Sequence, residues 1–142
     1  MQMADVVKYS GEGFNCAQIV CASAAKKLGI TEKTAYLMAA CFGGGMDCGE
    51  VCGAFSGGLM AIGLKYGNGV SGDVEARNRA KEKAQEFRTL FIEEYQHIRC
   101  KELLGYDFSK PHEAALIKEK GIIGQICPRL ILYATEILDE VL

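Results

Sequence analysis

The chain has 142 residues, of which 49% are hydrophobic, so one folded domain over residues 1–142 is expected and disorder of the whole chain is excluded. Sixteen Lys and Arg residues against 18 Asp and Glu residues leave a formal charge of -2, without the basic excess typical of nucleic-acid-binding proteins. Seven residues are cysteine, a content that directs attention to sulfur chemistry.

The N-terminal residues show no basic segment followed by an apolar one, so no secretory signal is expected and the protein is predicted to be cytoplasmic. In that reducing compartment, lasting disulfides are rare, and cysteines more often bind metals or undergo reversible redox reactions. The longest apolar run, Val51 to Leu64, is shorter than the roughly 20 residues that a bilayer crossing needs. We therefore expect no membrane insertion.

Apolar residues recur at helical spacing, and no segment shows the alternation typical of strands. The clearest helix carries an apolar stripe from Ala80 to Ile98 opposite a charged face. The predicted helices cover residues 2–9, 15–28, 31–42, 50–66 and 112–120, and the helix with the apolar stripe follows a loop at 67–72. A short turn is predicted at 100–105, and a last helix starts at Pro128. The predicted fold is all-α, a compact single-domain bundle of about six to seven helices.

The predicted helix from Glu50 to Tyr66 is central and rich in glycine. Gly53 and Gly57 are four residues apart, so they leave one face of the helix with almost no side chain. Each glycine disfavours a helix by about 1 kcal/mol relative to alanine. We expect close approach of another backbone, of a cofactor, or of both to compensate.

Three cysteines stand beside predicted helix starts. Cys16 follows an asparagine N-cap, Cys52 lies in the first turn after Glu50, and Cys127 is the expected N-cap before Pro128. The partial positive charge and free N–H groups of a helix N-terminus favour a thiolate over a thiol. These positions therefore predict lowered thiol pKa values and nucleophilic or metal-binding chemistry.

The remaining cysteines have weaker placements. Cys21 points about 140° away from Cys16 on the same helix, so it is expected in the core, and Cys41 is expected there too. Cys48, four residues before Cys52, is interpreted as a resolving thiol, an extra ligand or an exposed loop residue.

Cys100 follows the apolar stripe and is expected near an inner helix end. The acidic Glu50 is expected to stabilise a helix start, with proton relay as the alternative. There is no Cys-x-x-Cys pair, so common zinc, thioredoxin and covalent haem motifs are missing. Any site that the cysteines share must be assembled by tertiary folding.

Four ordered blocks are more specific than any single cysteine. Residues 13–18 read GFNCAQ, residues 42–46 read FGGGM, residues 49–57 read GEVCGAFSG, residues 100–105 read CKELLG and residues 127–128 read CP. Together they resemble the family of redox-active proteins named for its cysteine pattern, C_GCAxxG_C_C, over essentially the whole chain.

The resemblance implies four functional cysteines, Cys16, Cys52, Cys100 and Cys127. A distant likeness of that family to the non-haem part of split-Soret cytochromes implies an iron–sulfur cluster, with a dimer as one arrangement. The haem-attachment sequence of those cytochromes is missing here, so haem is not implied. Cys21, Cys41 and Cys48 fall outside the family pattern.

Three hypotheses follow. The leading one is an iron–sulfur module for electron transfer or redox sensing, with the four family cysteines, or Cys48 in place of one, as ligands and an electron-transfer partner. The second is cofactor-free thiol–disulfide redox, with Cys48 and Cys52, or Cys16 and Cys52, as the redox thiols. The third is a zinc-stabilised helical binding domain. The many small residues would suit a homodimer.

Overall fold

The computed structural model describes residues 1–142 and consists of nine α-helices and one additional turn, η1. In chain order these are α1 (Met3–Gly11), α2 (Cys16–Ser23), α3 (Ala25–Leu28), α4 (Glu32–Ala39), η1 (Gly45–Gly49), α5 (Gly53–Tyr66), α6 (Val74–Tyr95), α7 (Cys100–Leu104), α8 (Pro111–Glu119) and α9 (Ile122–Val141). There is no strand, only one isolated antiparallel bridge between Val51 and Arg99. The all-α prediction is confirmed, and the predicted count of six to seven helices is too low.

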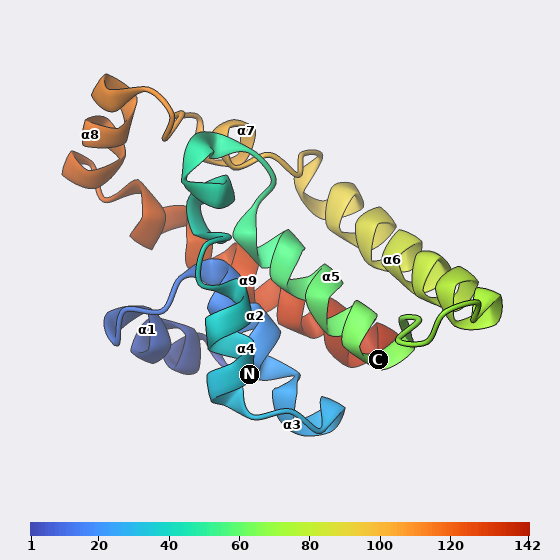
Figure 1. Cartoon of the computed structure of the whole chain (residues 1–142). Helices are drawn as coiled ribbons and strands as arrows, with labels where there is room; N and C mark the ends of the chain where they lie inside the picture. The colour runs from blue at the N-terminus through green and yellow to red at the C-terminus, as the bar shows by residue number, and fades with distance from the viewer.

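The main core lies where α5, α6 and α9 run alongside one another (Figure 1). The fully buried Phe55 of α5 has its ring centroid 5.5 Å from that of Phe87 and 5.4 Å from that of Phe91, both on α6. Gly58 makes room for this cluster, because a Cβ there would lie under 3.0 Å from the Phe87 ring. The predicted apolar stripe therefore packs against the predicted central helix.

α5 also packs closely against α2 through its glycines. A Cβ on Gly57 would lie 2.5 Å from the carbonyl oxygen of Ala17. Because two backbones approach here where a side chain would not fit, Gly57 permits contacts that offset its low helix propensity.

Two predicted helix boundaries are wrong. The helix expected over residues 15–28 is broken at Ala24 into α2 and α3. The last helix starts at Ile122, six residues before Pro128, which lies inside α9. An internal proline disfavours a helix by about 3 kcal/mol because it removes an N–H donor. Here Ile126 and Cys127 pack against buried side chains of α7 and α8, and this burial compensates.

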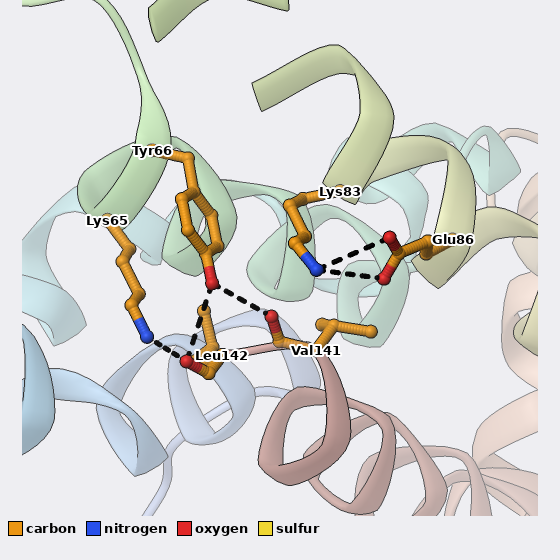
Figure 2. A network of polar contacts seen from close by, with 6 residues as sticks. All are labelled: Lys65, Tyr66, Lys83, Glu86, Val141 and Leu142. Carbon is orange, nitrogen blue, oxygen red and sulfur yellow. Dashed lines mark hydrogen bonds and ion pairs between the residues drawn. The ribbon is translucent and has the colours of Figure 1, made fainter. Parts of the chain in front are cut away.

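Figure 2 shows how the end of α5 is tied to the end of α9. The Tyr66 hydroxyl donates to the carbonyl oxygen of Val141 at 3.1 Å, and Lys65 donates to that of Leu142. On α6, Lys83 pairs with Glu86 at 3.2 Å.

None of the helices by itself has the length and apolarity of a bilayer crossing. Only α8 and α9 taken together reach them, and this pair is bent by 83°.

Candidate functional site: a cavity lined by four cysteines

A cavity of about 360 Å³ lies at the end of the bundle where α2, α5, α7 and α9 meet. Its lining includes Cys16, Cys52, Cys100 and Cys127, each from a different segment of the chain. At about 30 Å³ per water, this volume corresponds to roughly a dozen water molecules. The structure therefore brings together the four cysteines that the sequence singled out.

Cys16 is positioned by the start of α2. The Asn15 side chain accepts from the Gln18 amide at 2.9 Å, and the Gln18 side chain accepts from the Asn15 amide at 3.0 Å. The Asn15 side-chain amide also donates to the carbonyl of Ala40 at 2.9 Å. The predicted cap is thus present as a capping box, and it fixes the first residue of the helix, Cys16, relative to the segment after α4.

Cys52 is the N-cap residue of α5 rather than a member of its first turn. The next residue, Gly53, faces Cys16: a Cβ there would lie under 3.0 Å from the Cys16 sulfur and 2.9 Å from the carbonyl oxygen of Phe42. The glycine that begins α5 therefore brings the Cys52 segment against the Cys16 sulfur. The close approach expected to offset the low helix propensity of Gly53 is therefore in part a contact with the Cys16 sulfur.

The isolated bridge joins the Cys52 segment to the Cys100 segment. The amide of Cys52 donates to the carbonyl of Ile98 at 2.7 Å, and the amide of Cys100 donates to the carbonyl of Glu50 at 2.6 Å. Because side chains alternate along extended backbone, Cys52 and Cys100 lie on the same face of the bridge. Cys100 then begins the short helix α7.

Cys127 is not an N-cap, because it lies in the second turn of α9. Its position in the cavity comes from packing: it and Ile126 contact the cluster of Cys100, Leu104 and Ile117. The helix-terminus argument for this residue is therefore wrong, although the residue itself lines the cavity.

The predicted lowering of the thiol pKa values is also wrong for the protein without metal. Burial raises the pKa of Cys52 to about 12, and neighbouring sulfurs add to the shift. Burial likewise raises the pKa of Cys100 to about 12 and that of Cys127 further. For Cys16, burial raises the pKa even though several backbone N–H groups oppose it. Desolvation of a buried thiolate outweighs the helix terminus, so these thiols are protonated at neutral pH.

Backbone N–H groups nevertheless converge on the two sulfurs at helix starts. The amides of Gly44, Ala17 and Ala54 act to lower the pKa of Cys16, and that of Ala54 also acts on Cys52. Gly44 begins a turn in which the non-glycine residues Met46 and Asp47 have φ values of 60° and 55°. This left-handed backbone costs about 1–2 kcal/mol per residue, so the surrounding structure holds the turn against strain.

The rest of the lining is mostly apolar. Six side chains form these walls: Phe14, Leu103, Leu104, Phe108, Ile123 and Leu130. Ser10, Asp47 and Ile123 are exposed and mark where the cavity reaches the surface. Sequence reasoning missed Asp47 and Phe108. Asp47 falls between two glycine-containing blocks that were recognised, whereas nothing in the local sequence indicates Phe108.

The other three cysteines lie outside the lining. Cys21 is buried in a second core cluster, as predicted. Cys41, predicted in the core, is exposed, because α4 ends two residues before it. Cys48 is exposed and its thiol donates to the carbonyl of Gly45 at 3.2 Å. No three Cys, His, Asp or Glu side chains are grouped closely enough to hold a single metal ion.

Residues 14–141 match a sequence family described as "Putative redox-active protein (C_GCAxxG_C_C)". The chain belongs to the C_GCAxxG_C_C family. The matched region of this C_GCAxxG_C_C protein contains all four cysteines of the cavity. No curated protein and no solved structure gives a significant match. The likeness to split-Soret cytochromes stays a prediction.

Proposed function

We propose that this redox protein holds an iron–sulfur cluster on Cys16, Cys52, Cys100 and Cys127 and uses it for electron transfer or redox sensing. The observation that carries the proposal is the convergence of four thiols from four segments on one cavity. Four cysteine thiolates are the usual ligand set of [2Fe–2S] and [4Fe–4S] clusters.

The surroundings of the sulfurs fit such a group. The cavity, at about 360 Å³, is larger than a single ion requires, and its apolar walls restrict water. The amides directed at Cys16 and Cys52 would stabilise negative charge on those ligands. When bound, an iron–sulfur cluster supplies one-electron chemistry at a potential set by such hydrogen bonds and by burial.

Because their pKa values are raised, the four thiols must be deprotonated when a cluster binds. Each ligand has to lose its proton, so loading releases protons and becomes more favourable as pH rises. The buried sulfurs then gain positive metal charge in place of those protons. The metal-free protein is accordingly expected to be stable with protonated thiols and to load readily only where iron and sulfide are supplied together.

The test is anaerobic reconstitution of the reduced protein with iron and sulfide, followed by measurement of bound iron, acid-labile sulfide and visible absorbance. We expect stoichiometric iron and sulfide, and a large loss in each of four single variants, Cys16→Ser, Cys52→Ser, Cys100→Ser and Cys127→Ser. Cys41→Ser is the matched control and should load normally. Wild-type protein without stoichiometric iron and sulfide, or one with a single zinc and no iron, would overturn the proposal.

A second candidate is a cofactor-free dithiol pair formed by Cys16 and Cys52. It is favoured by the close approach of Gly53 to the Cys16 sulfur and by the electrostatic effect of Cys16 on Cys52. Oxidation would join the two sulfurs while two electrons and two protons pass to a small-molecule disulfide, which becomes two thiols. Cys48 is a weaker partner, because its thiol is exposed and contacts Gly45.

Mass spectrometry distinguishes the two candidates. The metal-free protein is equilibrated with reduced and oxidised glutathione, alkylated and digested. A Cys16–Cys52 linked peptide that appears and disappears with the glutathione ratio supports the dithiol pair. Full alkylation of both residues at every ratio excludes it.

A further inference from the structure

The segments that carry Cys52 and Cys100 are joined by very little backbone structure. Two hydrogen bonds, from the Cys52 amide to Ile98 and from the Cys100 amide to Glu50, form the isolated bridge in an otherwise helical chain. A bridge of this size is weak by itself, since short extended pairs are marginally stable in water. The relative position of the two sulfurs therefore depends on what surrounds the bridge.

The side chain of Glu50 spans this bridge. One carboxylate oxygen lies 3.7 Å from Arg99 Nε, and the other lies 3.3 Å from Lys101 Nζ. The two cations flank Cys100 in sequence, whereas Glu50 is two residues before Cys52. Glu50 therefore lies outside the first turn of α5, and its carboxylate connects the two cysteine segments.

Gly49, the residue before Glu50, is held in place by close packing against Lys101 and Asp107. A Cβ on Gly49 would lie 2.6 Å from an Asp107 carboxylate oxygen and 3.4 Å from the Lys101 Cβ. The backbone that enters the bridge thus packs directly against α7 and the residues after it. This packing limits the positions available to the Glu50 side chain, so pairing with both cations requires little further ordering.

We propose that Glu50 is a positioning residue that holds Cys52 and Cys100 at a fixed separation by pairing with Arg99 and Lys101 across the bridge. The proposal rests on the proposed function only where it assigns a purpose to that separation, namely placing two ligands of the same cluster. The pairing itself is a property of the metal-free chain. Two partly exposed ion pairs are expected to shift the opening equilibrium of the bridge by about two- to thirtyfold.

Hydrogen exchange of the Cys52 and Cys100 amides measures that opening, because a hydrogen-bonded amide exchanges when its partner separates. In the reduced, metal-free protein, Glu50→Gln should speed exchange of both amides about two- to thirtyfold, and amides in the middle of α6 should be unaffected. Glu50→Asp, which keeps the charge, should restore most of the protection.

Glu102→Gln is the matched control. Glu102 has a side-chain exposure of 43%, against 42% for Glu50, and pairs with His97 at 3.0 Å without crossing the bridge. It should leave both amides unchanged. If Glu50→Gln does not fold, a double variant with Arg99→Gln and Lys101→Gln provides the same test. Unchanged exchange in the folded variant, or equal acceleration in the Glu102→Gln control, would overturn the proposal.

A second measurement tests whether the pairing of Glu50 with Arg99 and Lys101 affects the four-cysteine site. In reconstituted protein, Glu50→Gln should shift the midpoint potential and lower iron occupancy, and Glu50→Asp should recover the occupancy. If Glu50→Gln has the same iron occupancy and midpoint potential as the wild type, Glu50 does not serve to place two ligands of one cluster. If wild-type protein binds no cluster, the proposed function fails. The hydrogen-exchange result still decides whether Glu50 holds the two cysteine segments together.

Discussion

Replacement of Gly53 by alanine tests the packing that joins Cys16 to the start of α5. A Cβ at this position would approach the Cys16 sulfur at under 3.0 Å and the Phe42 carbonyl oxygen at 2.9 Å. The carbonyl oxygen belongs to the backbone, so it cannot move away as a flexible side chain would. The Ala17 backbone nitrogen, at 3.1 Å, closes a third side.

Two opposing effects determine the magnitude. Alanine gains up to about 1 kcal/mol of helix propensity over glycine, less at the first position of a helix than in its interior. Overpacking of a filled site costs about 1–3 kcal/mol. We therefore expect Gly53→Ala to lower the free energy of unfolding by about 1–2 kcal/mol and the Tm by roughly 3–7 °C.

Urea denaturation of the reduced, metal-free protein, followed by circular dichroism, measures the change. Gly63→Ala is the control: it lies in the same helix with nothing within 4 Å of the added Cβ. That variant should be more stable than the wild type by up to about 1 kcal/mol. If Gly53→Ala were as stable as Gly63→Ala, the close contact between α5 and Cys16 would not exist in solution.

Other consequences follow from the same site. Removal of the capping box by Asn15→Ala should lower the free energy of unfolding by about 1–2 kcal/mol, measured by urea denaturation, and an unchanged value would contradict the role of this cap. Because burial raises the Cys52 pKa from 9.0 to about 12, its alkylation at pH 8 should be about a thousandfold slower in native protein than in urea. The folded state also binds that proton more tightly than the unfolded state does, so this stabilisation is complete below pH 9. The free energy of unfolding should then fall as pH rises from 9 towards 12, less steeply in Cys52→Ser, and equal slopes in the two proteins would refute the linkage.

Local signals in the sequence located several parts of the site correctly. Asn15 is a short polar residue followed three positions later by Gln18, and this pair forms the predicted cap. Glycines four apart in residues 50–66 indicated close backbone approach, and Gly57 contacts Ala17 as that pattern requires. Both features depend on residues within one turn of each other.

Two other local signals misled the prediction, because the outcome at these positions depends on residues that are distant in the sequence. Pro128 resembles a helix start, yet the helix continues through it because the partly buried Ile126 and Cys127 pack against α7 and α8. The thiol pKa values were expected to be low from helix termini alone, whereas burial by the rest of the chain raises them. Burial is a property of the assembled bundle.

The amino-acid order alone determined the helical class, most helix limits and the four family cysteines, because caps, glycines and apolar periodicity act over a few residues. Only the tertiary structure decided that Cys16, Cys52, Cys100 and Cys127 line one cavity and that Glu50 meets cations 49 and 51 positions away. Such meetings depend on helix packing and on the Val51–Arg99 bridge, which no local pattern encodes.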